Sequence, residues 1–208
     1  MVKSRSSVDR TDGRRRRSEL SRQQIVHALL ELIAAGEVYP SAEAVAANAG
    51  VGLRTVFRHF ENMETLYRQI YQAITAEVLP IAQEPFASGD WRLRIKEIID
   101  RRVRIFERIM PFKAAADVHR HQSVYLAEQG EVVTRLQRGA LSQILPREIK
   151  ADEPLFCALE LLLSFEAWRR LRKDQHLSVQ KARTVVERAV NALVNPRSQS
   201  RSGSGSQT

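Results

Sequence analysis

Apolar residues recur at helical spacing along most of this chain. One predicted helix spans Ser21 to Ala35 and places four apolar residues on one face: Ile25, Leu29, Leu32 and Ile33. Gly36 fits its end, because glycine adopts the left-handed backbone that closes many helices. No useful stretch of the sequence alternates apolar and polar residues, as a half-buried strand would. The pattern therefore predicts an all-α fold.

Prolines and caps divide the rest of the chain into further predicted helices. We expect Pro80 and Pro85 to punctuate the chain and Pro111 to break a long amphipathic segment, because proline lacks the N–H that an interior helical turn needs. The predicted helices cover residues 41–48, 53–60, 64–78, 90–110, 111–120, 123–144, 154–173 and 178–194. Residues 1–17 and 197–208 are polar and aperiodic, so both segments are predicted to be disordered.

The segment SAEAVAANAGVGLRTVFRHF, from Ser41 to Phe60, has the layout of a helix-turn-helix, which places its second helix in the DNA major groove. Ser41 is a good N-cap for the first helix, Ala46 is small enough for the two helices to cross closely, and Gly50 tolerates a left-handed corner. A mini-core is predicted for Val45, Ala49, Val51, Val56 and Phe60. The remaining positions of the second helix would then face outward. For this segment taken alone, an ordinary three-helix cluster with Phe57 in its core is the alternative.

Charge is distributed unevenly along the 208 residues, whose formal net charge is +9. Residues 1–17 carry seven Lys or Arg against two acids, whereas residues 18–70 carry four Arg against six Glu. The predicted DNA-reading module is therefore not basic itself. Its affinity for DNA would come from helix N-termini, a few placed arginines and the N-terminal arm.

The stretch AEAVAANAGVGLRTVFRHFENMETL resembles the DNA-binding domain of the TetR (tetracycline repressor) family. The residues in register with the family pattern are Ala49, Gly50, Val51, Thr55, Phe57, His59, Phe60, Glu64 and Leu66. Where the family commonly has Ser, Gly, Tyr and Lys, this chain has Gly52, Arg54, Phe57 and Met63. The resemblance implies a helix-turn-helix domain over residues 18–78, with the motif at 41–60, and a helical regulatory and dimerisation domain over residues 79–196.

The resemblance also implies roles for individual residues at the DNA. Thr55 and His59 would hold phosphate oxygens, and Ser41 would do so at the N-terminus of its helix. Arg54 is expected to contact a base edge, most naturally that of guanine. Leu53 and Phe57 would meet thymine methyl groups or the sugar backbone, and Arg58 either binds a phosphate or stays solvated. The run of Arg14, Arg15, Arg16 and Arg17 either follows the minor groove or forms a basic tail that raises non-specific affinity.

The last two predicted helices are apolar over broad faces. In the resembled family such helices pair with their copies as a four-helix bundle, and the resulting two-fold homodimer suits a palindromic operator on double-stranded DNA. The predicted interface residues are Leu155, Leu159, Leu162, Phe165, Val179, Val186 and Val190. The alternative is that both helices only form internal core.

By the same resemblance, the segment from Phe86 to Tyr125 would line a cavity for a small-molecule effector. The predicted lining residues are Trp91, Arg102, Phe106, Met110, Phe112 and Tyr125, with Arg102 as a polar anchor. Aromatic and methionine residues at helical spacing also fit an ordinary core.

Other chemistries find little support. Cys157, the only cysteine, lies in an apolar run and is expected to be a buried structural thiol, which fits a reducing cytoplasm. No apolar run approaches the length of a membrane span. His119 and His121 would point to different faces of a helix, so no metal or cofactor is predicted, and no nucleophile–base constellation points to an enzyme.

The sequence thus predicts a cytoplasmic, sequence-specific transcriptional regulator, a repressor that a small molecule releases from its operator. A DNA-binding protein without ligand control is the first alternative. A helical protein–protein module or an enzyme that carries a degenerate helix-turn-helix is the second.

Overall fold

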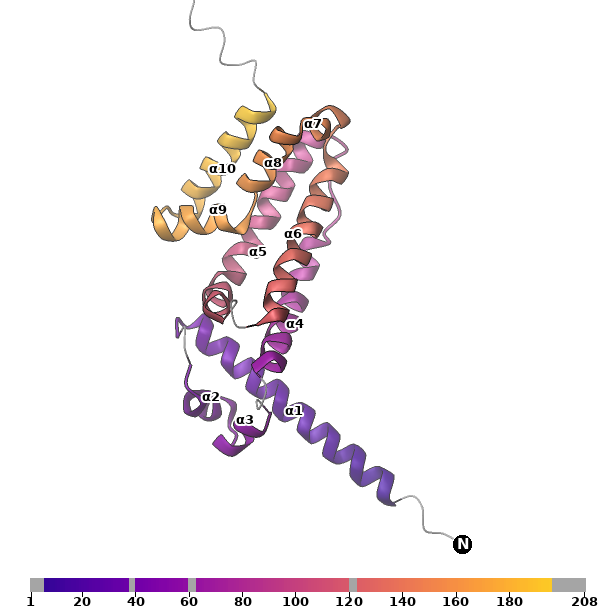
Figure 1. Cartoon of the computed structure of the whole chain (residues 1–208), viewed down its shortest axis with the longest axis vertical. Coiled ribbons are helices and arrows are strands. Elements are labelled where there is room, and N and C mark those ends of the chain that lie inside the picture. The colour runs from indigo at the N-terminus through magenta and orange to yellow at the C-terminus, as the bar shows by residue number, and fades with distance from the viewer. Residues whose placement is uncertain (1–5, 38–39, 60–62, 120–122, 196–208) are drawn as a thin grey trace, which may run out of the picture. The chain divides into compact units, whose positions relative to one another are not determined.

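A computed structural model describes residues 6–37, 40–59, 63–119 and 123–195 (Figure 1). Helices account for most of these residues and no strand occurs among them, which confirms the predicted all-α fold. The helices are α1 (Ser6–Ala34), α2 (Ala42–Ala49), α3 (Leu53–His59), α4 (Met63–Ala82), α5 (Trp91–His119), α6 (Val124–Ile144), α7 (Arg147–Ala151), α8 (Glu153–Leu162), α9 (Phe165–Arg169), the π-helix η2 (Arg170–Asp174) and α10 (Val179–Val194). They divide into two units, Met1–Glu77 with Ile109–Gln129, and Val78–Arg108 with Gly130–Thr208.

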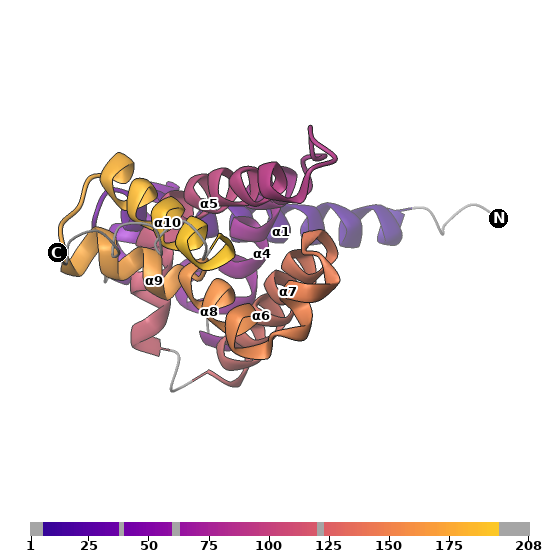
Figure 2. The same ribbon diagram turned by 90° about the horizontal axis from the view of Figure 1, so that it is seen from above.

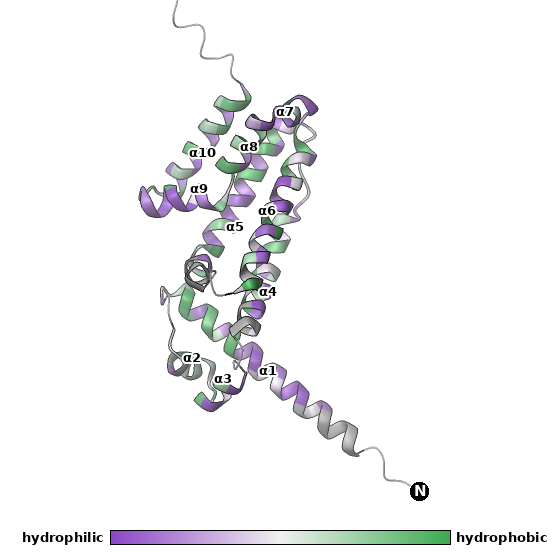
Figure 3. Cartoon of the chain, in the orientation of Figure 1, coloured by the Kyte–Doolittle hydropathy of each residue, from purple (hydrophilic) through white to green (hydrophobic). Residues whose placement is uncertain are grey.

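The core of the first unit joins α1, α2 and α3. Its buried residues are Ile25, Leu29, Ile33, Val45, Ala46 and Val56. Ala49 and Val51 pack against this cluster as partly buried neighbours, as do Ile70 and Phe112. The predicted mini-core is therefore confirmed, except that Phe60 lies outside the described residues. Figure 3 shows that the C-terminal part of α1 is largely hydrophobic and that its middle is hydrophilic.

Gly50 closes the corner between α2 and α3. Its backbone has φ 64° and ψ 31°, in the left-handed region that glycine enters without strain. Its N–H bonds back to the carbonyls of Ala46 and Ala47, and the N–H of Val51 donates to Ala46 O at 3.0 Å. At the other end of α2, the Ser41 hydroxyl accepts from the N–H of Ala44 at 3.1 Å. Both caps were predicted from the sequence.

The N-terminal half of α1 corrects the prediction of a disordered arm. Residues 6–17 are helical and continuous with the helix that the sequence placed at residues 21–35, whereas residues 1–5 lie outside the described part. Arginine has a high helix propensity, which favours helix over the arginine run. Because the apolar half of α1 is anchored in the core, extending it avoids the cost of nucleation.

Two prolines lie inside helices that the sequence predicted them to end. Pro80 is in α4, and Pro111 is in α5. Pro111 denies the carbonyl of Glu107 its helical N–H partner. Helix α5 nevertheless continues, because Met110 on one side of the proline is buried and Phe112 on the other packs on the core of the first unit. Tertiary packing outweighs the missing hydrogen bond here.

The second unit contains the end of α4, the first part of α5, most of α6, and α7 to α10. Helix α10 runs beside α8, as Figures 1 and 2 both show. The largest fully buried side chains here are Leu141, Leu159 and Val190. The predicted helix at residues 154–173 is interrupted, because Ser164 adopts an extended backbone and caps α9 through the N–H of Ala167. The π-helix η2 follows α9 directly.

Candidate functional site

Helix α3 presents one continuous exposed face. Arg54 and Arg58 are exposed and four residues apart, and so are Leu53 and Phe57. Residues four apart lie on the same side of a helix, so two arginines and two apolar side chains share adjoining stripes. Val56 points the other way into the core. The structure thus brings the predicted base-contacting residues together on one surface.

Phe57 is the unusual member of this face, since 57% of it is exposed. An exposed aromatic ring forgoes the burial that stabilises most phenylalanines. Phe57 is therefore not part of the core, and its side chain faces outward as predicted.

His59 lies at the end of α3 in a basic environment. Burial lowers its pKa most, the positive charges of Arg58 and Arg22 lower it further, and Glu19 opposes them. The Nε2 atom of His59 and the Nε atom of Arg22 are both buried without a hydrogen-bond partner among the described residues. Unsatisfied buried polar atoms are uncommon and mark places where a ligand, ion or water completes a site.

Arg22 is the residue that sequence reasoning missed. It lies on α1, far from α3 along the chain, and only the fold makes its charge act on His59. A single Arg within a predicted helix does not indicate that it lies near His59.

Thr55, the other residue predicted to hold a phosphate on α3, is half-buried like His59.

The arginine run is helical rather than part of a disordered arm. Arg15, Arg16 and Arg17 are exposed on α1, and the side chain of Arg14 lies outside the described residues. Successive helical residues point about 100° apart, so these arginines face different directions. A helix about 10–12 Å wide also does not fit a minor groove about 6 Å wide. As a helix, the run does not fit the minor groove.

The predicted ligand-pocket residues divide between the two units. Met110, Phe112 and Tyr125 belong to the first unit, where Phe112 packs on the core and Tyr125 stacks edge-on against Tyr71 at 5.8 Å. Trp91, in the second unit, lies under the guanidinium of Arg92. Their apolar character is explained by core packing and local contacts.

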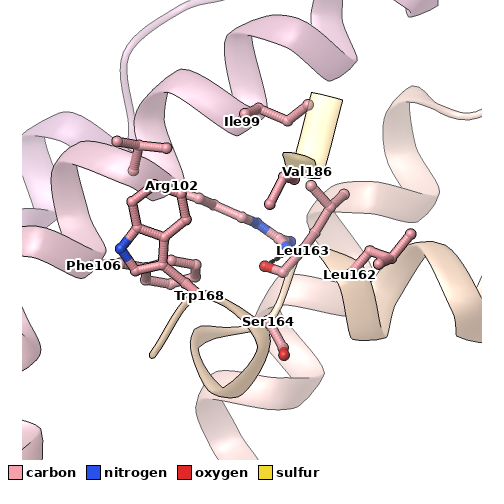
Figure 4. A pocket seen from close by; sticks show the side chains of 9 residues that line it. Ile99, Arg102, Phe106, Leu162, Leu163, Ser164, Trp168 and Val186 are labelled. Atoms are coloured by element: carbon pink, nitrogen blue, oxygen red, sulfur yellow. Dashed lines mark hydrogen bonds between the residues drawn. The ribbon is translucent and has the colours of Figure 1, made fainter. Parts of the chain in front are cut away.

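Arg102 and Phe106 do line a small cavity in the second unit (Figure 4). The other lining residues are Ile99, Val103, Leu162, Leu163, Ser164, Trp168 and Val186. Its volume of about 10 Å³ is room for about one water molecule. A drug-sized ligand needs about 300–1,000 Å³, so this cavity does not accept one without rearrangement.

A carboxylate fixes one wall of that cavity. Glu107 Oε1 accepts from Trp168 Nε1 at 2.8 Å and from Arg172 Nε at 2.8 Å, and Oε2 accepts from Arg172 Nη2 at 3.0 Å. Arg172 also donates to the carbonyl of Leu177, just beyond η2. The network holds α9 and η2 against α5.

Four of the predicted dimer-interface residues are interior. Leu159, Phe165, Val186 and Val190 are buried within the chain itself, so they do not form a contact surface. Leu155, Leu162 and Val179 are half-buried. The large hydrophobic residues that α8 and α10 expose are Leu161, at 63%, and Val185, at 43%. The sequence pattern identified the apolar helices but assigned four buried residues to a contact surface.

Cys157 also corrects a prediction, because the thiol is exposed rather than buried. It lies on α8 with Arg138 Nη1 at 3.9 Å from Sγ.

Among the described residues, no cluster of three His, Cys, Asp or Glu side chains could hold a metal ion. No helix in that part of the chain is long and apolar enough to cross a membrane. His119 as a side chain, and His121 altogether, lie outside the described residues.

Comparison of the chain with protein-family models, with curated proteins and with solved structures gave no match.

Proposed function

We propose that this protein is a DNA-binding transcriptional regulator that reads its operator with α3, in the manner of the TetR family. The exposed face of α3 carries the proposal, because it combines two arginines with Leu53 and Phe57 on a helix anchored by a Gly50 corner. Major-groove reading needs such a helix, with donors for base edges and apolar groups for thymine methyls.

Arg54 is assigned to a base edge and His59 to a phosphate. A bidentate contact from arginine to guanine is worth about 1–3 kcal/mol of discrimination against other bases. Arg22 joins His59 in the phosphate role, since a phosphate would supply the negative charge that these basic groups lack. The N-terminal α2 residues and Ser41 provide a helix N-terminus for a second phosphate.

A cytoplasmic homodimer on a palindromic site fits this assignment. Leu161 and Val185, exposed on α8 and α10, take the interface role in place of the buried residues. The repressor mechanism follows if an effector binds a conformation in which the two α3 helices no longer match the operator spacing.

The test is a mobility-shift assay with DNA from upstream of the protein's own gene, at low salt, on a sample shown to be dimeric by sedimentation. Wild-type protein and Arg147→Ala, which removes an exposed arginine of α7, should shift the DNA equally. Arg54→Ala should relax sequence preference, whereas His59→Ala should weaken all sites alike. No shift by the dimeric wild type would overturn the proposal.

The N-terminal half of α1 is tested by salt dependence. Deleting residues 1–17 should reduce the slope of log affinity against log salt by about one for each phosphate that these residues neutralise. An unchanged slope would mean that the arginine run does not touch DNA.

A regulator without ligand control is the second candidate. The observation in its favour is the cavity of about 10 Å³, which holds no organic effector as it stands. An effector site that opens only when the ligand binds would favour ligand control instead.

A further inference from the structure

Arg102 is a buried cation to which no carboxylate of the described residues bonds. It is only 8% exposed, and its guanidinium donates to two main-chain carbonyls, Leu163 O at 2.6 Å and Gln137 O at 3.2 Å. Arg101, which is also 8% exposed, provides the contrast, because its Nη2 lies 3.5 Å from Glu97 Oε2. Of these two equally buried arginines, only Arg101 has its charge paired.

Burial without a paired carboxylate among the described residues changes the pKa of Arg102. Burial lowers the pKa of Arg102 to about 10, and the charge of Glu160 only partly opposes that effect. Glu160 itself is paired with Arg138 at 3.6 Å. Arg102 therefore stays charged at neutral pH in surroundings that disfavour charge, and an anion would stabilise it.

Most of the side chains that line the cavity around the guanidinium are apolar. Figure 4 shows the Arg102 side chain reaching Leu163 among Ile99, Leu162, Trp168 and Val186. A ligand that matched this site would carry one planar anionic group, which the arginine fork binds with two parallel hydrogen bonds, and a small apolar body.

One wall of the cavity is a break between two helices. Leu163 and Ser164 form the corner between α8 and α9, and η2 follows directly. Leu163 O is the acceptor that a ligand oxygen would replace at Arg102. Because the closed cavity admits only about one water, the ligand enters only if this corner moves outward.

We propose that Arg102 anchors an effector site for an apolar monocarboxylate, which displaces Leu163 O and moves the α8–α9 corner. The effector role rests on the proposed regulatory function, but the binding site does not. Movement of the corner would shift α8, whose Leu161 belongs to the proposed dimer surface. The competing explanation is that Arg102 only caps the carbonyl end of α8, as basic residues often do.

The direct test compares octanoate with octanamide, which match in apolar body and differ in charge. The full chain carrying Trp91→Phe keeps Trp168 as the single tryptophan, and Trp168 lines the cavity. Octanoate at millimolar concentration should change Trp168 fluorescence saturably and raise the melting temperature, and octanamide should do neither. Equal responses to acid and amide, or no response to either, would overturn the proposal.

Two variants test whether Arg102 is the charged group that binds octanoate. Arg102→Gln should weaken octanoate binding at least tenfold, whereas Arg101→Gln, which removes an equally buried but already paired arginine, should bind normally. Full octanoate affinity in Arg102→Gln would contradict the assignment. If that variant does not fold, Arg102→Lys keeps the charge without the fork and should bind octanoate more weakly than wild type, and unchanged binding would count against the site.

The effector role of the site is tested separately, by adding octanoate to the protein–DNA complex. Release from DNA by the acid, but not by the amide, supports an effector role, and saturable binding without release limits the site to ligand binding and overturns that role. Absence of any DNA complex would instead refute the proposed function, and the fluorescence result would stand.

Discussion

Replacing Glu107 with glutamine tests whether the carboxylate that joins α5 to α9 and η2 stabilises the second unit. The change keeps one acceptor oxygen but replaces the other with an NH₂ group that faces the Nη2–H of Arg172. It also removes the charge from hydrogen bonds of 2.8 Å to both Trp168 and Arg172. Glu107 and Arg172 side chains are 30% and 23% exposed, so solvent screens them only in part.

The expected loss of unfolding free energy is about 1–3 kcal/mol, the range for hydrogen bonds to charged groups in partly buried settings. For a chain of this length, that corresponds to about 2–4 °C in melting temperature for each kcal/mol. Urea unfolding at pH 7, followed by tryptophan fluorescence, measures it. Glu131→Gln, which removes a carboxylate from an exposed pair with Arg135, is the control and should change little.

The pH dependence of this loss has a definite sign. Burial raises the pKa of Glu107, but hydrogen bonds from Arg172 and Trp168 and the charges of Arg172 and Lys173 lower it by more, so its pKa in the folded state is depressed. A depressed pKa stabilises the folded state above the unfolded value of about 4.3, and the contribution disappears as the pH falls through the folded value. The difference between wild type and Glu107→Gln should therefore be full at pH 7 and shrink below about pH 4. Equal stability at pH 7, or a difference that does not shrink on acidification, would refute this reasoning.

Other predictions concern the core, the corner and the exposed face. Leu159→Ala, at a fully buried position, should cost about 2–5 kcal/mol in urea unfolding, and a loss below about 1 kcal/mol would contradict its core role. Gly50→Ala should lower the melting temperature, because a side chain at φ 64° costs about 1–2 kcal/mol, and an unchanged midpoint would show that the corner is not strained. Phe57→Ala should leave unfolding within about 0.5 kcal/mol of wild type while reducing DNA affinity in anisotropy titrations, and intact affinity would remove Phe57 from the interface.

Local sequence rules were enough to predict the helix-turn-helix. Ser41 and Gly50 act at the two ends of α2 through caps that depend on neighbouring backbone alone, so the sequence predicts them correctly. The spacing of Val45 and Val56 likewise predicted burial, because each helix has one neighbouring surface to meet. The exposure of Phe57 follows once those two directions are fixed.

Features that depend on distant contacts were not predictable in the same way. Helix α5 continues through Pro111 because Met110 is buried and Phe112 packs on the core of the first unit. Local helix propensity does not include such contacts. The helix through Ser164 is interrupted where an alternative cap competes with helix continuation. Helical periodicity identified α8 as apolar, but it did not separate the inward stripe of Leu159 from the exposed stripe with Leu161, since the former depends on where α10 lies.

The most direct test of DNA reading by α3 is selection of bound sites from a random double-stranded DNA library by the full-length protein. We predict that wild type enriches an inverted repeat whose half-sites lie about one helical turn, or a multiple of it, apart. Arg54→Ala should lose preference at one base pair of each half-site, and His59→Ala should enrich the same repeat with lower yield. Enrichment of no sequence by wild type, or an unchanged preference in Arg54→Ala, would contradict the assignment of α3 as the reading helix.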